Sequence, residues 1–172
     1  MRKIIILLTL SLCMSFPIVV QDITSQYECL HFQYPKLTQE WFRLIQDECY
    51  KYNINPADVC AIIEYEGQWN ANSVNTKNKD GSIDYGLMQI NSKHVASHAE
   101  RFLNPKLNIQ KGVYEYYLCL RQSHYDKKEA NRLYNAGRAS HKVDYKNWNY
   151  VKRIDAERAK TQQIESEFYS LR

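Results

Sequence analysis

Glu66 is the side chain in this sequence best suited to acid–base chemistry. Val59, Ile62, Ile63 and Glu66 follow the i, i+3, i+4, i+7 spacing of one helix face, whereas Glu64 projects to the far side. A carboxyl group at the edge of an apolar stripe loses hydration, which raises its pKa. Such a group can donate a proton near neutral pH. The alternative is that Glu66 merely ends the helix and faces water.

Several short motifs accompany Glu66 along the chain. They are Trp69-Asn70, the run Gly86-Leu87-Met88-Gln89, Asn108-Ile109-x-x-Gly112, Tyr134-Asn135-Ala136-Gly137 and Tyr150-Val151. In this order and spacing, over about residues 54–151, they resemble the signature of the lytic transglycosylases. These lysozyme-like enzymes cut the sugar backbone of peptidoglycan, and the chain is most similar to small secreted members that accompany envelope-spanning machines.

The resemblance implies a mainly α-helical fold with a single lysozyme-like domain. It also implies that Glu66 is the single catalytic acid/base and that Met88 and Gln89 line the sugar-binding groove. Tyr134 would hydrogen-bond near the carboxyl group, and Asn135 would support the same wall. The implied reaction cleaves the β-1,4 bond between N-acetylmuramic acid and N-acetylglucosamine and forms a 1,6-anhydro sugar. It requires no cofactor and no metal.

The sequence departs from the family pattern beside Glu66. The family usually has Ser directly after the catalytic Glu, and this chain has Gly67; Ala71 replaces a common Pro. The missing hydroxyl indicates a slower enzyme or a weakly active, peptidoglycan-binding accessory subunit of an envelope-spanning assembly. A third interpretation is a muramidase, for which Asp80 or Asp84 would approach the scissile bond from the side opposite Glu66.

The N-terminus predicts export. Residues 1–20 read as a signal peptide, with Arg2 and Lys3 before an apolar run. Cleavage would leave no membrane span and place the protein in the periplasm or outside the cell; the alternative is an uncleaved anchor. The chain carries 23 Lys and Arg against 19 Asp and Glu, and this even balance argues against a nucleic-acid partner. We expect a monomer whose partner is the peptidoglycan glycan strand.

Four cysteines remain after the signal: Cys29, Cys49, Cys60 and Cys119. Oxidising conditions after export favour at least one disulfide, and three pairings are possible. Buried free thiols are the alternative, because Cys60 and Cys119 lie within helical patterns.

The expected helices are 38–52, 56–66, 108–120, 127–134 and 148–170, with a polar loop over 70–84 and no convincing strand. We divide the chain into a signal (1–20), an irregular segment (21–37), the catalytic domain (38–153) and a helical tail (154–172). The loop partly imitates a calcium-binding loop, but Leu87 replaces the glutamate that calcium needs. His94 and His98, four residues apart without a third ligand, are interpreted as surface histidines.

Overall fold

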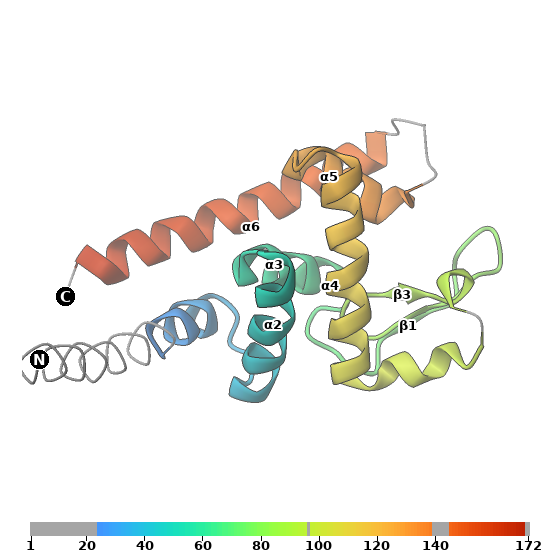
Figure 1. The fold of residues 1–172 in the computed structure, drawn as a ribbon, viewed down its shortest axis with the longest axis horizontal. Coiled ribbons are helices and arrows are strands. Elements are labelled where there is room, and N and C mark those ends of the chain that lie inside the picture. Colours follow the sequence, from blue (N-terminus) through green and yellow to red (C-terminus); the bar gives the residue numbers. More distant parts are fainter. Residues whose placement is uncertain (1–23, 96, 139–144, 171–172) are drawn as a thin grey trace, which may run out of the picture.

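The computed structural model describes residues 24–95, 97–138 and 145–170, and it is mainly α-helical (Figure 1). A helix over residues 24–33 is followed by α2 (Gln39–Tyr52), α3 (Pro56–Glu66), α4 (Pro105–Gln122), α5 (Lys127–Ala136) and α6 (Tyr145–Ser170). Between α3 and α4 lie two short 3-10 helices, η1 (Ser92–His94) and η2 (Ala99–Leu103), and three two-residue strands. The strands β1 (Val74–Asn75), β2 (Asp84–Tyr85) and β3 (Ile90–Asn91) form an antiparallel sheet in the order β1-β2-β3.

Local capping chemistry sets the helix starts. The Thr38 side chain accepts a hydrogen bond from the backbone of α2, and the Asn55 side chain does the same for α3. α4 begins three positions earlier than expected, because Asn104 caps it and Pro105 occupies its first turn. These caps satisfy backbone N–H groups that have no partner within a helix.

The core lies around α4. This helix packs against α2 and α5, and α6 packs against α3 and α5. Many of the largest fully buried side chains come from α2, α3, α4 and α6: Phe42, Ile45, Ile62, Ile63, Ile109, Tyr116 and Tyr150. The apolar stripe of α4 is buried, and it consists of Ile109, Val113, Tyr116 and Leu120.

The expected segment boundaries differ from the structure at both ends of the catalytic domain. Residues 24–33 are helical, so the expectation of an irregular 21–37 is wrong there. The expected boundary at 153/154 falls inside the continuous α6, where Ile154 is buried. These two helices hold each other in place, because the Thr161 hydroxyl donates to Gln33 Oε1 at 2.6 Å. The expected signal, residues 1–20, lies outside the described residues.

The prediction of a disulfide is not met. No disulfide joins the cysteines of the described residues: Cys49, Cys60 and Cys119 are free thiols, and all three, like Cys29, are buried. Burial raises the pKa of Cys119 to about 12, and burial likewise raises the pKa of Cys49 and Cys60. Thiols of this kind react slowly, because the thiolate is the reactive form.

A search of the described residues finds no helix that is both long enough and apolar enough to cross a membrane.

Candidate active site

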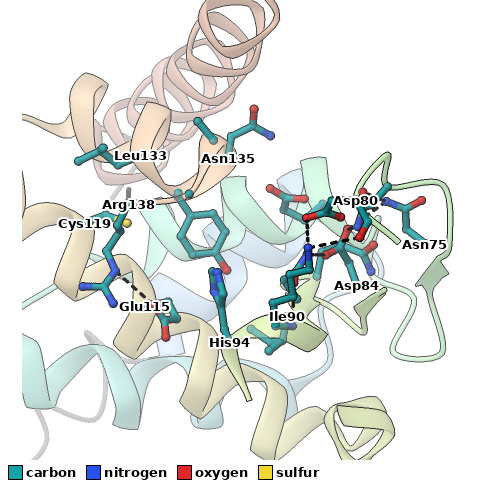
Figure 2. Close-up of a pocket in the computed structure, with 18 residues that line it drawn as sticks. Asn75, Asp80, Asp84, Ile90, His94, Glu115, Cys119, Leu133, Asn135 and Arg138 are labelled. Carbon is teal, nitrogen blue, oxygen red and sulfur yellow. Dashed lines mark hydrogen bonds and ion pairs between the residues drawn. The ribbon is translucent and has the colours of Figure 1, made fainter. Parts of the chain in front are cut away.

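A cleft of about 400 Å³ opens between the small sheet and the α4–α5 pair. Residues of the sheet and its loops line one side, including Asn75, Asp80 and Asp84, and the other side carries Glu115 and Cys119 of α4 with residues 133–138 (Figure 2). Glu66, the last residue of α3, lies in the same lining. The helix face predicted for Glu66 therefore brings it into a cavity rather than into open solvent.

The environment of Glu66 favours the protonated carboxyl group. Burial raises its pKa from 4.5 to about 7, and the negative charge of Asp84 acts in the same direction. The hydroxyl of Tyr150 opposes this rise, because a hydrogen bond to the carboxylate favours the charged form. Near neutral pH, Glu66 is thus divided between its protonated and ionised forms.

Tyr150 reaches Glu66 from α6 and is itself almost fully buried. Its hydroxyl lies close enough to the carboxyl group to lower the pKa of Glu66, and it has no other hydrogen-bond partner among the described residues. In the sequence, Tyr150 matches the family pattern, but the motif indicates no role for it. The missed signal is that a buried tyrosine hydroxyl needs a polar partner, which only the tertiary structure identifies.

Tyr134 lines the cleft, but its hydroxyl bonds elsewhere than expected. The hydroxyl donates to the backbone carbonyl of Met88 at 2.9 Å, rather than to a carboxyl group. Burial raises the pKa of Tyr134 and the charge of Glu66 raises it further, so Glu66 is a near neighbour. Tyr134 therefore ties the end of α5 to the turn that carries Gln89.

Met88 does not line the groove as predicted. Its side chain is fully buried in the core. It packs against Gly112 of α4, where a Cβ would lie 2.7 Å from the Met88 Cβ. The absence of a side chain at Gly112 therefore accommodates the Met88 side chain. Met88 supports the groove from beneath through its backbone contacts.

Asn108 fixes the same turn from α4. This fully buried residue accepts a hydrogen bond from the Met88 N–H at 2.8 Å and donates to the carbonyls of Tyr85 and Phe102, each at 2.7 Å. One amide side chain thus satisfies three backbone groups that would otherwise be buried without partners.

Gln89 and Asn135 both lie in the cleft lining. Gln89 has a positive φ of 46°, and its Nε2 donates to the Gly86 carbonyl at 2.8 Å. This bond turns the side chain back over its own loop. Asn135 is exposed on the opposite rim (Figure 2). The structure brings Glu66, Gln89, Tyr134 and Asn135 together at one cavity.

Asp84 is held by an amide network on the sheet side. Its Oδ2 accepts from Asn75 at 3.0 Å and from Asn78 at 2.7 Å, and its Oδ1 accepts from Asn91 at 2.7 Å. Asp80 also lines the cleft but is exposed and forms an ion pair with Lys93 at 2.7 Å. Of the two aspartates considered from sequence, Asp84 is the one whose charge acts on Glu66.

Close packing explains why Gly67 occupies the position where the family usually has serine. A Cβ on Gly67 would lie 2.5 Å from the Leu87 carbonyl oxygen and 2.7 Å from the Leu87 Cα. These are backbone atoms of the turn that carries Gln89, so they cannot move aside as a flexible side chain could. Gly67 therefore allows the end of α3 to contact this turn directly.

No group of three or more His, Cys, Asp or Glu side chains within the described part of the chain could hold a metal ion. His94 lines the cleft but is exposed, and His98 is an exposed residue paired with Glu100.

Comparison with known proteins agrees with this arrangement. The Transglycosylase SLT domain family matches residues 43–156. An inactive mutant of the lytic transglycosylase Slt from Pseudomonas aeruginosa has a similar fold, with a TM-score of 0.52 and 17% identity over 78% of this chain. Lysozyme C of Equus asinus is 43% identical over 51 residues, or 30% of this chain.

The chain spans only part of each relative, 24% of the Pseudomonas protein and 39% of the lysozyme. At its low identity, the Pseudomonas structure establishes a shared fold. The family match is more informative, since it spans most of the chain and includes Glu66, the Gln89 turn, Tyr134 and Tyr150. The chain therefore belongs to the Transglycosylase SLT domain family.

Proposed function

We propose that this protein is a peptidoglycan lytic transglycosylase with Glu66 as its single general acid/base. One observation carries the proposal: Glu66 lies in the cleft, and burial raises its pKa to about 7. A group with this pKa can both give and accept a proton near neutral pH. Family membership and the fold support the same activity.

The proposed reaction has two proton transfers at the same carboxyl group. Protonated Glu66 first donates to the glycosidic oxygen, and the bond from that oxygen to C1 of N-acetylmuramic acid breaks. The C6 hydroxyl of the same sugar then attacks C1, and the Glu66 carboxylate accepts its proton. The products are a free 4-hydroxyl and a 1,6-anhydro end, with no water consumed. Because the attacking oxygen belongs to the substrate, much of its positioning entropy is already spent.

The groove residues would hold the glycan for this reaction. Gln89 and Asn135 provide amide groups on the two sides of the cleft, and we assign them to sugar contacts. Tyr134 and Met88 would act indirectly, since their mutual hydrogen bond positions the Gln89 turn. Tyr150 would adjust the pKa of Glu66 and orient its carboxyl group.

A muramidase is the second candidate, because Asp84 shares the cleft with Glu66. A hydrolase needs a second carboxylate to act as nucleophile or to activate water. Three amide donors occupy the carboxylate oxygens of Asp84, and this argues for a structural role instead.

The place of action follows from the substrate. Peptidoglycan lies outside the cytoplasm, and the apolar N-terminal run supports export to the periplasm or beyond. We infer that the protein acts there, either alone or beside an envelope-spanning assembly. The hypothesis of a weakly active accessory subunit has less support, because close packing against Leu87 explains Gly67 without a loss of activity.

Product analysis tests the proposal. Purified peptidoglycan would be digested, and the released fragments would be identified by mass spectrometry. A transglycosylase yields 1,6-anhydro ends, a muramidase yields reducing ends one water heavier, and an accessory subunit leaves the wall intact. Glu66→Gln serves as the inactive control, because it keeps the shape of the side chain and removes the transferable proton. Reducing ends alone would overturn the proposed reaction.

A further inference from the structure

Three tyrosines form a surface cluster between α2 and α4, in which Tyr114 is exposed and Tyr52 and Tyr117 are half-buried. Tyr52 of α2 stacks on Tyr117 of α4 with ring centroids 4.7 Å apart, and it also contacts Tyr114 at 5.9 Å. Tyr114 and Tyr117 are 6.4 Å apart, and Tyr114 is 40% exposed. We call these three residues the tyrosine cluster. Neighbouring surface aromatic rings of this kind are typical of binding surfaces.

The tyrosine cluster lies on a different face from the cleft. α2 and the sheet lie on opposite sides of α4 (Figure 1), and the cleft opens on the sheet side. Within α4, Tyr114 and Tyr117 are rotated by roughly 100–160° from Glu115 and Cys119, which line the cleft. A ligand on the cluster would therefore not occupy the catalytic groove.

The exposed charge around the cluster is mainly positive. Lys111 lies over the Tyr114 ring at 5.9 Å, and Arg121 lies over the Tyr117 ring at 6.0 Å. Arg121 is exposed and makes no ion pair with the residues that the structure describes. Lys51, the residue before Tyr52, adds a third cation, which pairs with Glu48.

The acids beside these cations are largely covered. The side chain of Glu48 is 8% exposed against 51% for its partner Lys51, and that of Glu115 is 14% exposed against 25% for Lys111. Asp47 is an exposed acid near Lys51. The tyrosine rings at this surface are therefore flanked by cations. Such a surface suits a ligand that combines sugar rings with carboxylates.

We propose that the tyrosine cluster is a second contact site for peptidoglycan, separate from the catalytic cleft. Sugar rings would lie against the tyrosines, and carboxylates of the peptide stems would pair with Arg121 and Lys111. The inference rests on the proposed function, which makes this polymer the substrate. Two sites on one polymer raise its retention, because binding at one site raises the effective concentration at the other.

Binding to purified, insoluble peptidoglycan tests this site without catalysis. In a Glu66→Gln background, Tyr114→Ala and Arg121→Glu should each raise the dissociation constant measured by co-sedimentation about tenfold, as expected for truncating a central contact. Removing the peptide stems from the polymer should abolish the effect of Arg121→Glu but retain that of Tyr114→Ala. Melting temperatures would verify that both variants are folded.

Matched controls lie on α2, outside the cluster. Tyr50→Ala removes a tyrosine that is 89% exposed, and Arg43→Glu reverses an exposed charge. Both should bind within about twofold of the parent. With Glu66 restored, Tyr114→Ala and Arg121→Glu should cleave a soluble tetrasaccharide at the parent rate but cleave the insoluble polymer about tenfold more slowly.

The outcomes separate the two proposals. If the parent cleaves soluble fragments but both cluster variants bind and cleave the polymer as the parent does, the second site is wrong and the proposed function stands. The face would then be available to a protein partner, for which tyrosine and arginine are equally suitable. If the parent neither binds the polymer nor cleaves soluble fragments, the proposed function itself is wrong.

Discussion

Two carboxylates face the same cleft from opposite environments. Glu66 ends a helix whose inner face is apolar, and burial raises its pKa to about 7. Asp84 lies on a strand and accepts hydrogen bonds from three asparagine side chains. Dehydration without strong donors favours the protonated form of Glu66. The two similar side chains thus differ in their surroundings: one is dehydrated, and the other is held by amide groups.

The two sides of the cleft also differ in how they are built. The Glu66 side depends on close packing among α3, the Gln89 turn and two buried tyrosines. The Asp84 side depends on a network of polar side chains within one small sheet. Mutations on the first side should therefore change chemistry and pH dependence, and those on the second should mainly change local stability.

The largest expected effect is that of Glu66→Gln, which removes the transferable proton. Peptidoglycan cleavage should fall by about a thousandfold or more, while Glu64→Gln, on the other helix face, should retain most activity. Turnover of the two purified variants measures the difference. Near-parental activity of Glu66→Gln would contradict the proposed role.

The same variant tests the environment of Glu66 through stability. Between pH 4.5 and about 7, the folded protein keeps a proton that the unfolded chain has released, so stability falls as pH rises through this window. Glu66→Gln removes that penalty. Its free energy of unfolding should exceed that of the parent by about 3 kcal/mol at pH 8 and match it near pH 4. Equal stability at both pH values would mean that Glu66 is well hydrated.

Tyr134→Phe should have the next largest effect on turnover. It keeps the ring and removes the hydrogen bond to the Met88 carbonyl, so the Gln89 turn loses one of its supports. We expect cleavage to fall about tenfold and stability by about 1 kcal/mol. Cleavage rate and melting temperature, measured on one preparation, decide the matter. Unchanged turnover with lower stability would make Tyr134 purely structural.

Asp84→Asn compares the second carboxylate directly with the first. In a transglycosylase, cleavage at the pH optimum should change by less than about tenfold, whereas a muramidase would lose about a hundredfold or more. Loss of the negative charge should lower the pKa of Glu66, so the alkaline limb of the pH–rate profile should move to lower pH. Placing an amide among three amide donors should also cost about 1–3 kcal/mol of stability.

Gly67→Ser restores the residue usual in the family and tests the packing of the Glu66 side. Because a Cβ would meet the Leu87 backbone, we expect a loss of about 1–3 kcal/mol in stability and no gain in turnover. Urea unfolding and cleavage assays measure both. Higher activity at unchanged stability would show that the chain lacks only the hydroxyl.

Tyr150→Phe should have the smallest effect on the cleavage rate. Its effect should be visible in the pH–rate profile. The hydroxyl favours the ionised form of Glu66, so its removal should raise the pKa of Glu66 and move the alkaline limb to higher pH. A movement opposite to that of Asp84→Asn is the specific expectation. Identical profiles for Tyr150→Phe and the parent would exclude this interaction.

Local sequence signals predicted the elements and the main acid. Asn55 and Pro56 mark the start of α3, and helical spacing from there separates Glu66 from Glu64. Capping residues and apolar periodicity act over a few neighbouring positions, so they can be read without knowing the fold. The motif resemblance likewise brought Gln89, Tyr134 and Asn135 to one site, and the structure places all three in the cleft lining.

Only the tertiary structure decided which atoms meet. Met88 turns into the core, Tyr134 bonds to a backbone carbonyl, and Tyr150 reaches Glu66 from a helix more than eighty positions along the chain. The cysteines of the described residues form no disulfide, and the Leu87 backbone leaves no room for a side chain at Gly67. Such contacts depend on the packing of distant segments to within a fraction of an ångström, and local periodicity carries no information at that precision.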